Sequence, residues 1–395
     1  MTDPWDRFVH DAGSREVVGY FERAGEDGGP GTAWWFTDPP ETVSLRPSDR
    51  ADGARARTAR FLSRNPRGAV VGYLSFDAVG LFEPALRTFP SGSPFPLAEL
   101  ALVPRIRSAA VPPTSRRPLP RGRVGTPASD SLPRARFGRS VRRLVEAIRA
   151  GEAFQVVLAH RRAWARPVDL VRRASRLRAG ERYSSFYYLR FGDREIVGAT
   201  PESVAEVEGR TAFVDPIAGT LPRGRLGGRR PLAVDPKELC EHRMLVDLAR
   251  NDLGRVARAG TVRLVWSERR VRYARLEHLV SRVAATVGPS VAPWDVLAST
   301  FPAGTVSGAP KIRATELLRE EERSWRGPYA GAVAVVLPKR HATFALTIRS
   351  GFAAGPRLYT AAGAGIVHRS TPEREFRETL AKLSAVESAL VGEAA

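Results

Sequence analysis

Cysteine, lysine and long apolar runs are scarce in this sequence, and each shortage excludes a class of protein. The chain of 395 residues has a single cysteine, Cys240, so a fold stapled by internal disulfides is excluded. No apolar run approaches the roughly 18 residues that a membrane span needs. The first residues, 1–6, are polar and acidic, unlike the basic and then apolar start of a signal peptide. We therefore expect a cytoplasmic protein with no membrane partner.

The charge is strongly positive, yet very little of it comes from lysine. Lys and Arg total 62 against 42 Asp and Glu, which gives a net charge of +20. A nucleic-acid partner is the first hypothesis, but the arginines are spread along the chain and no zinc-finger, basic-zipper or RNA-recognition pattern appears. Arginine in place of lysine throughout a chain is typical of a GC-rich genome. We expect no nucleic-acid partner. The four lysines are Lys237, Lys311, Lys339 and Lys382.

Composition divides the chain into three parts. Residues 1–103 mix short apolar runs with turns, residues 104–132 have the Pro- and Arg-rich composition of an exposed linker, and residues 133–395 alternate strand-like and helix-like patterns. This alternation predicts an α/β or α+β fold. Apolar spacing predicts helices over 137–150 and 236–253, and Thr371 as an N-cap followed by Pro372 predicts the start of a last helix. Predicted strands cover 154–158, 185–189, 195–199, 261–265 and 342–352.

Two pairs of glutamates are spaced to share a helix face. Glu238 and Glu241 are three residues apart in one predicted helix, and Glu375 and Glu378 repeat the spacing in the last one. Two such pairs facing each other would form an all-oxygen site that suits Mg²⁺. Each pair also has an ordinary interpretation, because glutamates stabilise the first turn of a helix and Glu378 can pair with Lys382.

Other groups could bind an anion or move a proton. Residues 361–366 are small and predict a turn whose N–H groups bind a carboxylate, or else close packing. Arg349 lies in the middle of the predicted strand 342–352, where it either binds a carboxylate or faces solvent. His278 has apolar neighbours and is either a proton shuttle or a core histidine. The segment before Lys311 does not have the spacing of a phosphate loop, so we expect no nucleotide there.

The order of these segments resembles that of one enzyme family. They are Ala-Thr-Pro-Glu at 199–202, Pro-Ile-Ala-Gly-Thr at 216–220, residues 238–252, Phe-Pro-Ala-Gly-Thr-Val-Ser-Gly-Ala-Pro-Lys at 301–311, Arg-Gly-Pro-Tyr at 326–329, the glycines at 363–365 and residues 375–382. The sequence resembles chorismate-utilising enzymes: anthranilate synthase component I, aminodeoxychorismate synthase component I, and the isochorismate and salicylate synthases. The resemblance implies two large antiparallel β-sheets packed face to face, with helices outside and chorismate in a cleft.

The resemblance also implies a role for each matching residue. Glu202 corresponds to the general acid that protonates the departing C4 hydroxyl of chorismate, Lys382 to a lysine beside the metal and carboxylate site, and His278 to a histidine of pyruvate elimination. Mg²⁺ would be held by Glu238, Glu241, Glu375 and Glu378. The positions that correspond to substrate-binding residues are Ala199, Gly219, Thr220, Thr305, Tyr329, Arg349, Gly363, Ala364 and Gly365.

Two positions indicate which reaction of the family to expect. Members that add water carry a lysine base where this chain has Gln155, and many aminodeoxychorismate synthases carry a lysine nucleophile where this chain has Ala218. Neither glutamine nor alanine can do that chemistry. The prediction is amination of chorismate at C2 by ammonia, followed by loss of pyruvate to give anthranilate. Release of 2-amino-2-deoxyisochorismate, synthesis of 4-amino-4-deoxychorismate and a basic nucleic-acid-binding protein remain as alternatives.

The chain also departs from the family. A clear Leu-Leu-Glu-Ser segment is absent near the N-terminus, and residues 181–185 replace the family's Asn-Pro-Ser-Pro-Tyr. Both segments belong to the tryptophan feedback site of anthranilate synthases, so we expect weak or no inhibition by tryptophan, as in a copy used for specialised metabolism. We find no glutaminase domain in the sequence, and therefore expect free ammonia or a separate glutamine amidotransferase subunit as the nitrogen source.

Overall fold

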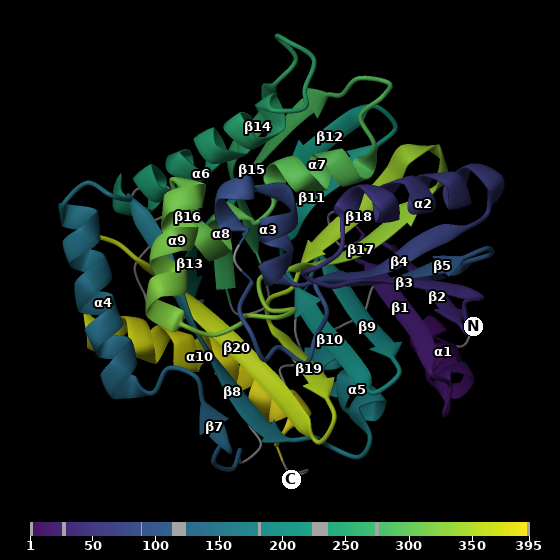
Figure 1. Ribbon diagram of the computed structural model, residues 1–395, viewed down its shortest axis with the longest axis horizontal. Helices are drawn as coiled ribbons and strands as arrows, with labels where there is room; N and C mark the ends of the chain where they lie inside the picture. Colours follow the sequence, from purple (N-terminus) through teal and green to yellow (C-terminus); the bar gives the residue numbers. More distant parts are fainter. Residues whose placement is uncertain are drawn as a thin grey trace.

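A computed structural model describes residues 3–25, 29–87, 89–112, 124–180, 183–222, 236–272 and 276–392. Within these ranges, the side chains at 51, 218–222, 236–238, 240, 272 and 276–278 lie outside the description. The fold is built from two antiparallel sheets with helices around them (Figure 1).

The first sheet combines strands from early and late parts of the chain. Its order is β16 (Gly308–Ala309), β8 (Gln155–Ala165), β20 (Arg357–Ile366), β19 (Ser350–Ala354), β10 (Arg194–Thr200), β9 (Ser185–Phe191), β1 (Val17–Arg23), β2 (Gly31–Thr37) and β6 (Arg107–Val111), with β7 (Ser129–Asp130) paired to β8. Strands β6 and β7 lie inside the predicted linker 104–132, so parts of this segment pair into the sheet.

The second sheet also combines early and late strands. Its order is β13 (Ile217–Pro222), β15 (Leu276–Thr286), β12 (Thr211–Val214), β11 (Ser203–Glu208), β18 (His341–Leu346), β17 (Ala332–Leu337), β4 (Ala69–Leu74), β5 (Ala98–Val103) and β3 (Glu41–Leu45), with β14 (Arg263–Arg272) paired to β15. Strand β1 pairs with β9, and β4 pairs with β17. The region 1–103 therefore completes both sheets, and the boundaries at 103 and 132 stay predictions.

Helices cover the outside of the sheets, as Figure 1 shows for α10 behind β20 and β8. They are α1 (Pro4–Ala12), α2 (Ala51–Arg64), α3 (Val79–Phe82), α4 (Arg134–Arg149), α5 (Leu170–Gly180), α6 (Pro236–Gly254), α7 (Pro293–Thr300), α8 (Gly304–Ser307), α9 (Lys311–Glu322) and α10 (Pro372–Leu390). The three predicted helices correspond to α4, α6 and α10 and are confirmed. No helix in the described ranges is both long and apolar enough to span a membrane.

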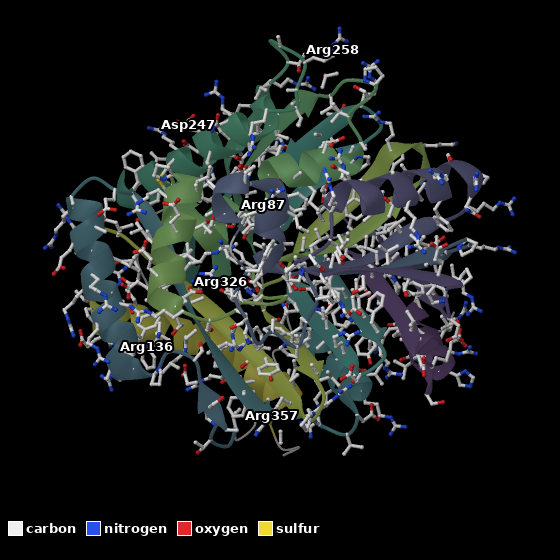
Figure 2. All side chains as sticks on the ribbon, viewed as in Figure 1. Arg87, Arg136, Asp247, Arg258, Arg326 and Arg357 are labelled. Atoms are coloured by element: carbon white, nitrogen blue, oxygen red, sulfur yellow. The ribbon has the colours of Figure 1, made fainter. Side chains whose placement is uncertain are left out.

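Both faces of the first sheet are buried. On the inner face, Phe191 packs against Tyr73 of the second sheet, with ring centroids 6.1 Å apart. On the outer face, Trp5 of α1 contacts Phe186, and Leu390 of α10 joins the same apolar cluster. The predicted architecture of two packed antiparallel sheets with helices outside is confirmed. Arginine side chains are spread over the molecule, from Arg258 at the top of the view to Arg87 near its centre and Arg357 at the bottom (Figure 2).

Two of the places where the chain passes from one sheet to the other lie side by side. One crossing, residues 201–202, joins β10 to β11, and the other, residues 347–349, joins β18 to β19. The Ala199 amide donates to the Arg349 carbonyl (3.3 Å), and the Leu346 amide donates to the Glu202 carbonyl (3.0 Å). The predicted continuous strand 342–352 is wrong here. Its polar–apolar alternation continues, but the backbone turns at Arg349, where φ is +51°.

The small-residue segment 361–366 is a strand, so the predicted turn is also wrong. Residues of β20 pair with β8 as far as Ile366 opposite Val156. The glycines have a steric reason instead. A Cβ on Gly365 would lie 2.3 Å from Gln155 Nε2, and one on Gly363 would lie 3.2 Å from the Tyr329 hydroxyl. The missing side chains leave room for two polar groups over the end of this strand.

Candidate functional site

Glu202 lies at the first crossing between the sheets and is the most unusual acid of the site. Its Oε1 accepts a hydrogen bond from the Thr305 hydroxyl of α8 at 2.5 Å. Burial raises the pKa of Glu202 to about 7, although the Thr305 hydrogen bond and the charges of Arg349 and Lys382 act in the opposite direction. A carboxyl group with this pKa is about half protonated at neutral pH. It is therefore suited to donate a proton to a leaving group.

Lys382 connects α10 to the end of β20. Its Nζ donates to the Gly363 carbonyl (2.9 Å) and pairs with Glu378 Oε1 (2.9 Å), four residues earlier on the helix. The expected i,i+4 ion pair is therefore present, and the same ammonium also reaches the strand. About half of the Lys382 side chain is exposed (51%). It lies where a substrate anion could approach from solvent.

Tyr329 and the edge of β20 provide neutral donors. The Gly363 amide hydrogen-bonds to the Tyr329 hydroxyl, and burial raises the pKa of Tyr329 to about 12, so this phenol stays protonated at neutral pH. Backbone direction alternates along a strand, so the Gly365 amide points to the same edge as that of Gly363. Pairing of β20 with β19 ends at Thr360. This edge can therefore present N–H groups to an anion.

Arg326 holds this part of the site together, and pattern reasoning alone did not single it out. The guanidinium is buried and donates to the Val306 carbonyl (2.7 Å), the Val157 carbonyl (2.6 Å) and both oxygens of Glu322. It thereby joins α8, β8 and α9. The only sequence signal was its place before Gly327 in the Arg-Gly-Pro-Tyr segment.

The proposed metal ligands are placed only in part. Glu375 is almost fully buried on α10, Glu378 is less than half exposed, and Glu241 is partly buried on α6. The side chain of Glu238 lies outside the described part. Among described residues, no three His, Cys, Asp or Glu side chains are grouped as a metal site. Carboxylate oxygens are nevertheless the donors that Mg²⁺ prefers, and this ion often takes only one or two of them and keeps water. The donor set fits Mg²⁺, and the assignment stays a prediction.

The remaining predicted residues divide into two groups. Ala199 and Ala364 are fully buried in β10 and β20, so their side chains shape the strands under the site. The side chains of Thr220 and His278, and the surroundings of Gly219, lie outside the described part. The structure thus brings Glu202, Thr305 and Lys382 together with Tyr329, Arg349 and the glycines of β20. For the others, the predicted roles are not tested.

A cavity adjoins Glu202 and Thr305 on the side of the second sheet and α6. Its lining includes Glu202, Asp215, Leu248, Asp252, Thr300 and Thr305. Glu202 therefore borders this cavity and is also close enough to Arg349 and Lys382 for their charges to lower its pKa.

Comparison with known proteins identifies the family of this chain. The model of the chorismate binding enzyme family matches residues 20–388. The chain belongs to this family. The matched region contains Glu202, Thr305, Arg349 and Lys382, together with every other residue assigned above to the site. The members of this family are enzymes that use chorismate.

Relatives in this family include several proteins named anthranilate synthase component 1. The chain is 44% identical to the one from Streptomyces coelicolor over 269 residues, which is 66% of this chain and 52% of that protein. It is 38% identical to the one from Thermus thermophilus over 369 residues, covering 82% of this chain and 79% of that protein. The chain thus spans about half the length of the first relative and more of the second.

Solved structures of the family have the same fold. Anthranilate synthase component I from Streptococcus pneumoniae superposes with a TM-score of 0.78 at 26% identity, covering 90% of this chain and 92% of that one. The menaquinone-specific isochorismate synthase from Escherichia coli gives 0.78 at 17% identity, covering 99% and 92%. This second likeness concerns the fold alone.

Proposed function

We propose that this member of the chorismate binding enzyme family is the chorismate-aminating component of an anthranilate synthase. Ammonia attacks C2 of chorismate, the ring double bond shifts, and the C4 hydroxyl leaves as water. The amino intermediate then loses its C2 proton and its enolpyruvyl group, which departs as pyruvate, to give anthranilate. The names of the relatives support the overall reaction, and the residues of the site support its first step.

The observation that carries the proposal is the place of Glu202 at the crossing between the sheets, where the Thr305 hydroxyl donates a hydrogen bond to its carboxyl group. When the C4–O bond breaks, the leaving oxygen needs a proton, and a carboxyl group with a pKa of about 7 supplies it at neutral pH. Thr305 fixes the orientation of this carboxyl group through its hydrogen bond to Oε1. A well-positioned general acid contributes roughly 10²- to 10⁴-fold to the rate.

Gln155 supports ammonia instead of water as the nucleophile. Its amide nitrogen lies so close to Gly365 that a Cβ there would be 2.3 Å away, so the glutamine side chain lies over Gly365 near the end of β20. An amide has no basic lone pair to deprotonate water near pH 7, whereas free ammonia already carries the lone pair that attacks carbon. The glutamine can accept a hydrogen bond from an incoming N–H through its carbonyl oxygen.

The two carboxylates of chorismate need separate partners in this proposal. Arg349 and the neutral phenol of Tyr329, with the amides at the edge of β20, would bind the enolpyruvyl carboxylate. The glutamates of α6 and α10 (Glu238, Glu241, Glu375 and Glu378) would hold Mg²⁺, which supplies charge neutralisation at the ring carboxylate when it is bound. Lys382 would add a positive charge between the two ends, since it joins Gly363 to Glu378.

The nitrogen source is either free ammonia or a glutamine amidotransferase subunit that delivers it. The experiment that tests the function supplies ammonium directly: the protein is incubated with chorismate, Mg²⁺ and ammonium at pH 8, and the products are identified. We expect blue-fluorescent anthranilate and an equal amount of pyruvate. An amino acid product without pyruvate would refute the second step, and isochorismate would refute amination.

The metal assignment has its own variant. Glu241→Ala should abolish Mg²⁺-dependent turnover while the thermal midpoint stays near that of the wild type, since Glu241 is only partly buried. Direct Mg²⁺ binding by calorimetry should weaken in parallel. Full activity of this variant at limiting Mg²⁺ would show that the ion is held elsewhere.

A further inference from the structure

Lys311 is the first residue of α9, and its ammonium group is buried. Nζ donates to Asp252 Oδ2 at 2.7 Å and to the Thr300 carbonyl at 2.9 Å, and the two charged side chains are 8% and 10% exposed. Asp252 belongs to α6, and Thr300 is the last residue of α7. One lysine therefore joins the ends of three helices.

The segment between Thr300 and Lys311 carries Thr305, the hydrogen-bond donor to Glu202. Since Lys311 binds the carbonyl of Thr300, its side chain closes residues 301–310 into a loop. The loop also packs directly on α6: a Cβ on Gly304 would lie 2.2 Å from Leu248 Cδ2. Asp252, the anionic partner of Lys311, is one helical turn beyond Leu248. The ion pair and this apolar contact thus hold the loop against the same helix.

A shared cavity connects the ion pair to the acid. Asp252 and Thr300, the two partners of Lys311, line the cavity beside Glu202 together with Thr305. A change in the distance between α6 and the loop would alter this cavity. Because Thr305 belongs to this loop, the change would also move its hydroxyl relative to Glu202. The hydrogen bond is short, at 2.5 Å, so a small displacement would lengthen it.

We propose that the Lys311–Asp252 ion pair is a positioning element of the active site, which fixes loop 301–310 against α6 and so keeps the Thr305 hydroxyl on the carboxyl group of Glu202. Neither Lys311 nor Asp252 acts on the substrate. Their effect on the reaction passes through Thr305. The inference rests on the proposed function only in that Glu202 is the general acid.

The residue type fits this role. In a chain that uses arginine almost everywhere, the position keeps lysine, whose compact ammonium donates to a carboxylate and a carbonyl in a narrow space. A guanidinium is larger and planar, so Lys311→Arg would keep the charge but push α6 and the loop apart.

The test measures the protonation of Glu202 directly. Glutamate labelled with ¹³C at the carboxyl carbon gives a titration curve for each side chain, and the Glu202 signal is the one lost in Glu202→Gln. Other charged groups that face Glu202 are Arg349, Lys382 and the cavity carboxylates Asp215 and Asp252. Because Asp252 is itself changed, Asp215→Asn serves as the control for loss of a cavity charge. Lys339→Met, at an exposed lysine, controls for loss of a lysine.

Thr305→Val defines the signal, because loss of the hydrogen bond removes a group that lowers the pKa of Glu202. We expect its titration to move up by about one to two pH units. The charge-free double variant Lys311→Met/Asp252→Asn should show a similar upward shift, with kcat reduced about tenfold. Adding Thr305→Val to the double variant should produce little further change, since the hydrogen bond is already lost.

The outcomes separate positioning from a purely structural role. A double variant that folds, with Glu202 titrating as in the wild type, would overturn the proposal. If the double variant does not fold, Lys311→Arg decides: an upward shift supports positioning, and a wild-type titration overturns it. The titration needs no turnover, so it remains decisive if the wild type makes no anthranilate, a result that would refute the proposed function instead.

Discussion

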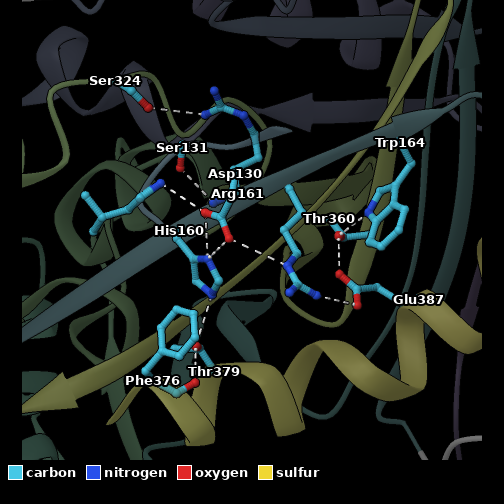
Figure 3. Close-up of polar contacts among 12 residues, drawn as sticks. Asp130, Ser131, His160, Arg161, Trp164, Ser324, Thr360, Phe376, Thr379 and Glu387 are labelled. Atoms are coloured by element: carbon cyan, nitrogen blue, oxygen red, sulfur yellow. Dashed lines mark hydrogen bonds and ion pairs between the residues drawn. The ribbon is translucent and has the colours of Figure 1, made fainter. Parts of the chain in front are cut away.

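Asp130 and Glu202 are two acids that both lie near positively charged side chains. They differ in the number of groups that donate a hydrogen bond to the carboxyl group. Asp130 accepts from the Leu132 amide (3.0 Å) and from His160 Nδ1 (2.9 Å), and Arg162 Nε lies 3.6 Å away (Figure 3). Glu202, by contrast, has its carboxyl hydrogen bond with Thr305, while the charges of Arg349 and Lys382 act on it without a described hydrogen bond.

The donors decide the protonation state. Burial by itself would raise the pKa of Asp130, but the His160 hydrogen bond and charge, the Leu132 amide and Arg162 outweigh it, so that the pKa is lowered. For Glu202, burial is the larger effect and the pKa rises to about 7. A carboxylate surrounded by donors is a permanent anion, and one with few donors in a buried place can release a proton near neutral pH.

The surroundings of Asp130 show what the anion does. His160 Nε2 lies 3.0 Å from the Thr379 hydroxyl of α10, and Arg162 pairs with Glu387 of the same helix at 3.1 Å. Thr360 of β20 also donates to Glu387 (Figure 3). This Asp130 network binds α10 to β8 and β20. Since α10 carries Glu375, Glu378 and Lys382, the network holds these three site residues in place relative to the first sheet.

Glu202→Gln gives the largest expected effect on catalysis. The variant keeps the size of the side chain but has no proton to donate, so kcat should fall by roughly 10²- to 10⁴-fold. Stability should not fall: a raised native pKa means that stability is lost as pH rises through about 7, and glutamine escapes this loss. Anthranilate fluorescence and thermal melting at pH 8 measure the two effects. Glu208→Gln, at the exposed end of β11, is the control. Activity near the wild type would assign the acid role to another group.

Asp130→Asn should show the opposite pattern, with lower stability and little change in chemistry. Loss of charged hydrogen bonds to His160 should cost about 1.5–3 kcal/mol of unfolding free energy at pH 7, measured by urea denaturation. Because the pKa is lowered in the native state, this contribution is present above about pH 4, the ordinary pKa of an unfolded aspartate, and is lost as pH falls further. The difference between variant and wild type should shrink in acid.

Asp247→Asn, at an exposed position of α6, is the matched control and should leave the unfolding free energy unchanged (Figure 2). An Asp130→Asn protein with normal stability and a kcat reduced more than tenfold would contradict the division into an anchoring and a reacting carboxyl group.

The pH dependence of kcat/KM also tests whether Glu202 acts as an acid, and its expected effect is smaller than that of Glu202→Gln. Glu202 must be protonated to act, so kcat/KM for chorismate should fall about tenfold per pH unit above a midpoint near 7. Free ammonia has to be held constant at each pH, since its own protonation would otherwise dominate the profile. A midpoint below 5 would mean that Glu202 is an ordinary surface-like carboxylate.

Tryptophan should produce the smallest effect, namely weak or no inhibition. Glu22 of β1 is buried, and its carboxylate accepts from Tyr183 (2.5 Å) and Arg178 (2.7 Å). Tyr183 belongs to the segment 181–185 that replaces the family's Asn-Pro-Ser-Pro-Tyr. Its hydroxyl is therefore already hydrogen-bonded to Glu22 within the protein. We expect little or no change in initial rates in the presence of sub-millimolar tryptophan. Strong inhibition at that concentration would show that a feedback site persists.

The sequence predicted the helices of the site better than its strands. Apolar spacing and helix-capping residues are local properties of the sequence, and α6 and α10 begin at Pro236 and Pro372 as expected. Alternation cannot reveal that a chain leaves one sheet for another, so the break at Arg349 was missed. Nor could small residues at 361–366 be identified as a strand, because the reason for them is Gln155, more than 200 residues earlier.

Grouping of the site residues came from the resemblance to a family and not from their spacing. The Lys311–Asp252 pair joins residues 59 apart in the sequence, and its hydrogen bonds depend on the packing of three helices. Only coordinates could assign it. Conversely, Thr220 rests on the resemblance alone, and Glu238 and His278 rest on sequence pattern and resemblance, because their side chains lie outside the described part.

The paired crossings between the sheets limit how this enzyme can change in evolution or by design. Glu202 and Arg349 lie on neighbouring segments that are hydrogen-bonded to each other, so an insertion of one residue in either strand would reverse its pattern of faces and separate the two groups. The acid and the arginine therefore keep their relative positions only if both segments keep their length. A single substitution at Gln155 is a simpler way to change the nucleophile or the substrate. Gln155 lies on β8, next to Gly365, and is not part of either crossing.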